Sequence, residues 1–92
     1  MTDPLAEFRH RFRARAIADR AELELLAQGD RTSADLRRLV HNLAGTAGTF
    51  GYAALSCAAI EVDDQMAAGR PADKASLDRL KERLDDVARP VT

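Results

Sequence analysis

The feature that most constrains the fold is the spacing of apolar residues, which recur at three- and four-residue steps in four separate segments. This period is that of one face of an α-helix, whereas a half-buried strand shows strict alternation. Helix-capping residues, glycines and turn sequences separate the segments, and no strand-like run lies between them. The sequence therefore predicts an all-α chain, in which four amphipathic helices with short connections form an antiparallel up-down four-helix bundle.

The helices are predicted within a single domain, and their starts and stops are marked by caps. Asp3 followed by Pro4 opens the first helix, Thr32 or Ser33 the second, and Ala72 or Asp73 the fourth, while Gly29 and Gly51 end the first two. The predicted ranges within the domain 1–92 are about 4–28, 33–50, 52–68 and 73–88. The inward stripes are Leu5, Phe8, Phe12, Ala16, Leu23 and Leu26; Leu36, Leu39, Val40, Leu43, Ala47 and Phe50; Leu55, Ala59, Val62 and Met66; and Leu77, Leu80, Leu84 and Val87.

Composition narrows the class of protein further. Among 92 residues, 14 basic and 15 acidic side chains give a formal charge of −1, which favours neither nucleic acid nor an anionic membrane as a partner. Cys57 is the only cysteine, so a disulfide framework is excluded and a reducing compartment fits best. No apolar run approaches the roughly 20 residues that span a bilayer. We expect a cytoplasmic protein with no membrane partner.

Residues 41–51, HNLAGTAGTFG, have two interpretations: a glycine-rich phosphate-binding loop, or a helix that carries His41. A phosphate-binding loop of the dinucleotide or P-loop kind follows a strand and opens a helix. Here the preceding residues, SADLRRLV, have a helical pattern, and neither GKS nor GKT is present. The apolar stripe also runs straight through the glycines. We therefore interpret the segment as helix.

As a helix, this segment places His41 on the outer face. At 100° per residue, His41 lies roughly 140° from the direction of Leu36, with Gly45 at about 180° and Gly48 at about 120°. Two glycines inside a helix cost roughly 1 kcal/mol each relative to alanine. That cost on an exposed face suggests that small residues let the surface of another protein approach the imidazole. His10 lacks such small neighbours and fits an ordinary solvated residue.

HNLAG followed by TAGTFG resembles the signature of histidine-containing phosphotransfer (HPt) domains. The family pattern is His-x-Leu-Lys-Gly with a second glycine six residues after the first. His41, Leu43, Gly45 and Gly51 occupy those places, and AGTFG is also similar to the HPt domain of chemotaxis histidine kinases. The resemblance covers the second and third predicted helices, and the length and four-helix plan agree over most of the chain.

The resemblance implies a phosphoryl carrier of a two-component phosphorelay rather than an enzyme. His41 would accept a phosphoryl group from the phospho-aspartate of a response-regulator receiver domain or from a histidine kinase, and pass it on as phosphohistidine. The imidazole of histidine is nucleophilic when it is neutral, and most histidine side chains are neutral at cellular pH. In the family Nε2 is phosphorylated while Nδ1–H is held by an acceptor. No cofactor is expected, because Mg²⁺ would belong to the receiver partner alone.

In HPt domains the acceptor for Nδ1–H, often Gln or Glu, lies on the next helix, 22 positions past the histidine. Asp63 occupies that position here. An antiparallel turn near residue 51 also sets His41 level with residues 61–63. A carboxylate at this place would orient the ring and stabilise charge that develops on it. A solvated acidic run, formed by Glu61, Asp63 and Asp64, remains an alternative interpretation.

The chain departs from the family pattern at one position, since the lysine that neutralises the phosphoryl group is Ala44 here. Arg37 and Arg38 lie one helical turn before His41, so either can supply the missing positive charge. The missing lysine also leaves open a degenerate family member that binds a receiver or kinase without phosphotransfer.

We expect a partner-binding surface around His41, made of small and apolar residues. Its predicted members are Ala44, Gly45, Gly48, Tyr52 and Ile60. In the alternative without phosphotransfer, the ridge of Ala44, Gly45 and Gly48 simply packs against a partner helix. A third interpretation, nucleic-acid binding by the arginine-rich first helix, lacks the aromatic residues and the overall basic charge that such binding needs. No metal site is expected, and the chain is expected to be a monomer.

Overall fold

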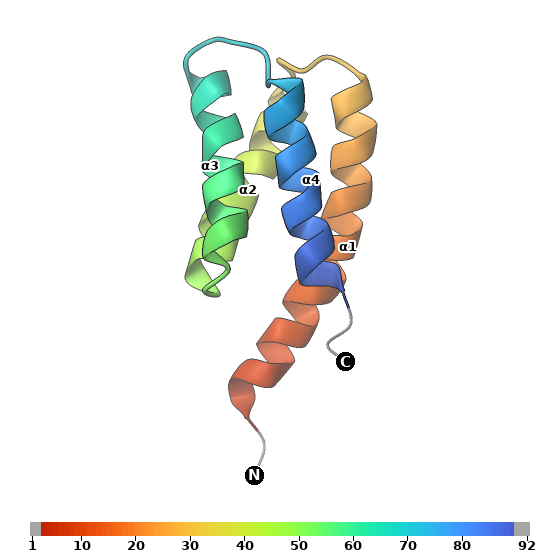
Figure 1. The fold of residues 1–92 in the computed structure, drawn as a ribbon, viewed down its shortest axis with the longest axis vertical. Helices are drawn as coiled ribbons and strands as arrows, with labels where there is room; N and C mark the ends of the chain where they lie inside the picture. The colour runs from red at the N-terminus through yellow and green to blue at the C-terminus, as the bar shows by residue number, and fades with distance from the viewer. Residues whose placement is uncertain (1–2, 90–92) are drawn as a thin grey trace.

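The computed structural model describes residues 3–89, so the predicted domain ends at residues 1–2 and 90–92 lie outside the described part. Its helices are α1 (Pro4–Gln28), α2 (Ala34–Thr49), α3 (Ala53–Ala67) and α4 (Lys74–Ala88). Successive helices run in opposite directions (Figure 1). α1 and α3 each pack against both α2 and α4. The predicted all-α four-helix bundle is confirmed, and residues 3–89 contain no strand.

Side-chain caps begin three of the four helices. Asp3, Ser33 and Asp73 each accept a hydrogen bond from a backbone N–H of the following turn, at 3.0, 3.2 and 3.3 Å. Such caps satisfy amide groups that a helix leaves without an internal partner. At the other ends, Gly51 (φ 83°) and Gly69 (φ 79°) adopt a left-handed backbone that suits glycine and reverses the chain. The turn at Gly51 lays α3 antiparallel against α2.

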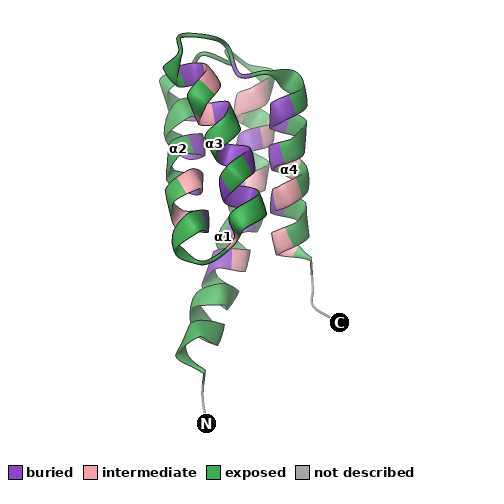
Figure 2. Cartoon of the chain, turned by 60° about the vertical axis from the view of Figure 1, so that its left-hand side comes forward, coloured by how far each residue is buried: buried purple, intermediate pink, exposed green. Residues whose placement is uncertain are grey.

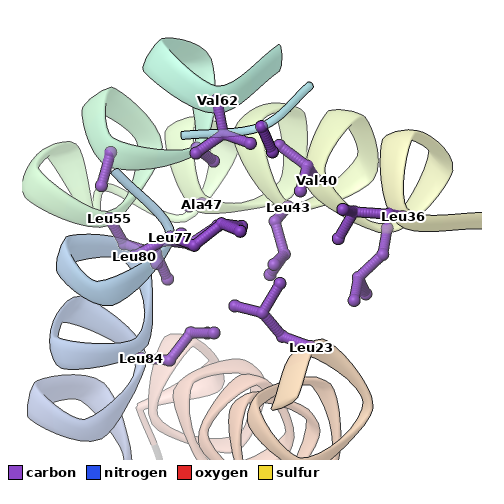
Figure 3. Close-up of a cluster of buried hydrophobic side chains, with 14 of the residues drawn as sticks. Leu23, Leu36, Val40, Leu43, Ala47, Leu55, Val62, Leu77, Leu80 and Leu84 are labelled. Atoms are coloured by element: carbon purple, nitrogen blue, oxygen red, sulfur yellow. The ribbon is translucent and has the colours of Figure 1, made fainter. Parts of the chain in front are cut away.

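The core lies along the axis of the bundle and is built from Leu, Val and Ala (Figure 3). Because many of these residues are small, the helices approach one another closely. One sign of this is the Ser56 hydroxyl, which donates a hydrogen bond of 2.9 Å to the carbonyl of Ala44 on the neighbouring helix. The largest fully buried side chains of the core are Leu23, Leu36, Leu55, Leu80, Leu84, Val40 and Val62.

α1 is longer than its neighbours, and this corrects part of the predicted core. It has 25 residues, against 16, 15 and 15 for the others. Its first turns therefore extend beyond the bundle, where they are exposed (Figures 1 and 2). Leu5 is 58% and Phe8 46% exposed, so the prediction that they face the core is wrong. The stripe has the right helical phase, but no helix lies opposite it at this end.

Asp19 interrupts the apolar stripe of α1 and is only 9% exposed. It lines a groove between α1 and α2, with Arg15 Nε 3.7 Å from its carboxylate. Burial raises the pKa of Asp19, and the nearby Arg15 guanidinium opposes that rise. The groove between α1 and α2 is thus polar, in contrast to the Leu-rich interior.

We expect Leu80→Ala to lower the free energy of unfolding by about 3 kcal/mol, because it removes buried methyl groups and leaves a cavity. Leu80 is fully buried on α4. Stability of a small domain is on the order of 5–10 kcal/mol, so this loss is readily measured by urea unfolding. Leu5→Ala, at a 58% exposed position, is the matched control and should change stability by less than about 0.5 kcal/mol. Equal effects of the two substitutions would contradict this assignment of the core.

Candidate functional site

His41 projects into solvent from the outer face of α2. The opposite face of this helix is buried in the core, and its buried residues are Leu36, Leu39, Val40, Leu43 and Ala47. The side chain of His41 is 73% exposed. The helical phase that buries the apolar stripe therefore presents the imidazole outward, with room for a reacting group around it.

Asp63 on α3 holds the imidazole from one side. Its Oδ2 lies 3.1 Å from His41 Nδ1, and its side chain is only 19% exposed. An ionised carboxylate accepts hydrogen bonds and cannot donate them, so Nδ1 is the donor in this pair. In a neutral ring the other nitrogen, Nε2, then carries the lone pair. The arrangement leaves one nucleophilic nitrogen free, and a negative charge behind the ring.

Glu61, Asp63 and Asp64 do not form one solvated acidic run, because two of these side chains contact different neighbouring helices. Glu61 accepts hydrogen bonds from Arg79 and Ser76 of α4, and these bonds lower its pKa. Asp63 instead faces His41 of α2. Two residues of one helix thus serve two different interfaces.

The two arginines one turn before His41 differ in what they contact. Arg37 Nε lies 4.0 Å from Asp63 Oδ1, a buried oxygen that accepts no hydrogen bond from residues 3–89. Arg38 turns to Asp35 on its own helix, with 3.4 Å between Nη2 and Oδ1. Both arginines line a shallow hollow beside His41, but only Arg37 also lies next to Asp63.

Gly45 and Gly48 both lie on the exposed ridge of α2, but for different physical reasons. A Cβ at Gly45 would meet nothing within 4 Å, so nothing in the described chain requires a glycine there. A Cβ at Gly48 would lie 3.3 Å from Ser56 Oγ, the hydroxyl that joins α2 to α3. Small size at Gly48 serves helix packing, whereas small size at Gly45 only clears the surface beside His41.

We expect Gly45→Ala to raise the free energy of unfolding by about 0.5–1 kcal/mol, because alanine favours the helix and clashes with no neighbour. Gly48→Ala is the matched control on the same ridge. It should gain less or lose stability, because its Cβ crowds the Ser56 hydroxyl. Chemical denaturation of both variants measures the difference. Equal gains would show that the contact with Ser56 is unimportant.

A shallow groove runs along α2 beside the imidazole. Its lining residues are His41, Asn42, Gly45, Thr46, Thr49 and Phe50. Phe50 is 38% exposed, so its predicted place at the end of the inward stripe of this helix is only partly right. Its ring centroid lies 6.1 Å from that of Phe8 and 5.5 Å from that of Phe12. Asn42, Thr46 and Thr49 were not among the predicted site residues, although their helical phase relative to His41 places them on the same outer side.

The two larger residues predicted at the partner surface occupy different surroundings. Ile60 is 45% exposed and lies one turn before Asp63 on α3. Tyr52 is half-buried and stacks on Phe12, with ring centroids 4.7 Å apart. Ile60 is therefore near the site, while Tyr52 belongs to the aromatic cluster at the end of the bundle. Their roles in binding stay predictions.

Two further features of residues 3–89 concern metals and membranes. Within this range, no group of three or more His, Cys, Asp or Glu side chains is arranged to hold a metal ion. None of the described helices has both the length and the apolar character that crossing a bilayer requires.

Comparison with known proteins agrees with this geometry. The family model of the Hpt domain matches residues 7–90. No curated protein and no solved structure shows a significant match. Domains of this family take part in phosphorelays together with histidine kinases and receiver domains. The match covers nearly the whole chain and extends over all four helices except the first residues of α1, so the protein belongs to the Hpt domain family of two-component signal transduction.

Proposed function

We propose that the chain is a phosphoryl carrier whose phosphorylated atom is Nε2 of His41. The observation that supports this most strongly is the combination of a 73% exposed imidazole with a carboxylate 3.1 Å from Nδ1. In the step proposed, Nε2 attacks the phosphorus of a receiver's phospho-aspartate. The N–P bond forms, the P–O bond to the aspartate breaks, and the carboxylate leaves. The reverse step delivers the group to another receiver.

Asp63 has a positioning role in this proposal. As Nε2 forms its bond to phosphorus, the ring gains positive charge while Nδ1 keeps its proton. The carboxylate of Asp63 stabilises that charge and fixes the orientation of the ring. Because Asp63 is mostly buried, water screens this interaction less than it would at an open surface.

Arg37 supplies the positive charge that the family lysine would provide at Ala44. It is 54% exposed and already lies beside Asp63, so a change of rotamer suffices to bring its guanidinium to a phosphoryl group on Nε2. Arg38 was the other candidate, but its contact with Asp35 draws it away from Asp63.

We expect Arg37→Ala to slow phosphotransfer about tenfold, because it removes a charge-assisted contact with the phosphoryl group. Arg38→Ala should have an effect of less than about twofold, which makes it the matched control. Single-turnover transfer from a phosphorylated receiver measures both rates. If neither substitution changes the rate, this turn of α2 does not compensate for the missing lysine.

The docking partner is a receiver domain, with a histidine kinase as the alternative donor. Its contact surface would be the groove along α2 with Ala44, Gly45 and Gly48, and Ile60 on the flanking helix. Tyr52 would contribute from the end of the bundle. The carrier needs no cofactor of its own, because Mg²⁺ is held by the receiver, and both partners would meet it in the cytoplasm. A carrier of this kind is a phosphorylated intermediate rather than an enzyme.

The test is transfer of labelled phosphate from a phosphorylated receiver to the wild-type chain in the presence of Mg²⁺. The label should be acid-labile and base-stable, as for phosphohistidine, and should map to His41 by mass spectrometry. Failure to label with any receiver or kinase that binds the chain would overturn the proposal. Binding without label would instead support the degenerate interaction module, which the alanine at position 44 favours.

A further inference from the structure

The side of α1 that faces away from the bundle is apolar, although such surfaces normally carry charge. Ile17 is 56% and Leu25 70% exposed, and Ala14, Ala18 and Ala21 are exposed with them. We call these five residues the outer stripe of α1. Apart from Asp19 on the core side, α1 is apolar over this length both toward the core and away from it, which is unusual for a helix with one face in water.

The outer stripe has the spacing of a helix–helix seam. Ala14, Ala18, Ala21 and Leu25 follow one another at steps of four, three and four, the alternation of a heptad repeat. Arg11 precedes Ala14 by three residues and Gln28 follows Leu25 by three, so both extend the heptad spacing. From Arg11 to Gln28 the seam is about 26 Å long. α2 and α4 pack against other sides of α1, and none of the described elements covers the stripe.

Charges beside the stripe select the occupant. Arg15 and Glu22 flank the seam on the same side, seven residues apart, and both are exposed. In an antiparallel pair of identical helices, flanking residues on one side meet the same side of the second copy in reverse order. Arg15 of each copy then faces Glu22 of the other. In a parallel pair, Arg11 would instead face Arg11 of the second copy, and no carboxylate would lie opposite Arg15.

Glu22 is free for such a pairing, since it makes no ion pair within residues 3–89. Arg15 reaches only Asp19, at 3.7 Å, and its side chain stays 67% exposed. By contrast, Glu24 on the α4 side is already engaged by Arg20 and Lys81. Beside the stripe, Glu22 therefore has no ion-pair partner within residues 3–89 and Arg15 has only the longer contact with Asp19, and these are the two charges that an antiparallel copy would match.

We propose that two copies of the chain associate through the outer stripes as a symmetric antiparallel α1–α1 pair. Ala18 packs against Ala21 of the second copy, and Leu25 against its Ala14, so the small residues let the helices approach closely. The seam is short, so the interface lies at the small end of the range for protein pairs and we expect a weak, reversible dimer. His41 lies on α2 outside the seam. This proposal departs from the monomer expected from sequence and is independent of phosphotransfer.

Sedimentation equilibrium of the full chain over a wide concentration range tests the association. We expect a monomer–dimer equilibrium that Leu25→Glu weakens at least 100-fold. Leu5→Glu, which places the same charge at an exposed apolar position on α1 outside the stripe, should leave it unchanged. A monomer at every concentration overturns the proposal. So does a Leu25→Glu variant that still dimerises, or one that loses receiver binding instead, since another protein would then occupy the stripe.

Charge reversal tests the antiparallel arrangement. Arg15→Glu and Glu22→Arg should each weaken the wild-type dimer about tenfold, because both symmetric pairs become repulsive at once. An equimolar mixture of the two variants should associate again, since a copy with two acids faces a copy with two bases. Absence of this recovery overturns the arrangement. Glu22→Arg leaves the Arg15–Asp19 pair intact, so it reports on the dimer even if Arg15→Glu perturbs the fold.

Discussion

Replacing His41 by Gln is expected to abolish phosphorylation of the chain, lowering label incorporation at least about a thousandfold. Glutamine matches the polarity of the imidazole and can still bond Asp63, but its amide nitrogen has no lone pair available for attack. The fold should be unaffected, because the side chain is 73% exposed and makes its one side-chain contact at Asp63. Stability should therefore change by less than about 0.5 kcal/mol.

The matched control is His10→Gln, on the exposed projecting part of α1. This variant should be labelled at the wild-type rate. Label that persists in His41→Gln with acid-labile, base-stable character would place the phosphorylated residue elsewhere. Loss of label in both variants would point to a general defect in receiver docking.

Asp63→Asn is expected to slow phosphorylation of His41 on the order of 100-fold. The substitution removes the negative charge that stabilises the ring as it becomes positive. The asparagine amide can also donate to Nδ1, which would move the ring proton to Nε2 and block the attacking atom. Single-turnover kinetics measure the loss, and Asp63→Glu should restore part of the rate because it returns the carboxylate.

Two comparisons separate this positioning role from a structural one. Asp64→Asn changes the adjacent, exposed carboxylate and should leave the rate unchanged. Phosphoramidate, a small donor that needs no docking surface, should show the same deficit with Asp63→Asn as a phosphorylated receiver does. A deficit confined to the receiver would mean that Asp63 contributes to docking and not to the ring.

The starts of three helices could be predicted from short-range signals in the sequence. Asp3 with Pro4, Ser33 and Asp73 are short-range signals, since a cap interacts with the next three residues only. The helices accordingly begin at Pro4, Ala34 and Lys74, directly after these caps. The outward direction of His41 could likewise be predicted from the sequence, because the helical period fixes its angle relative to the buried stripe of the same helix. Leu5 and Phe8 have the same period, yet their burial depends on whether another helix lies opposite.

The sequence by itself therefore determined the four helices, their order and the outward face that carries His41, because each depends on neighbours within a few residues along the chain. Asp63 was expected beside His41 from the family resemblance, and its Oδ2 lies 3.1 Å from Nδ1. Only the tertiary structure decided what Arg37 and Gly48 contact, because these contacts form between α2 and α3. From their spacing alone, Arg37 and Arg38 were equally good candidates for the positive charge beside His41. The packing of α3 against α2 placed a buried carboxylate oxygen next to Arg37 and so distinguished the two.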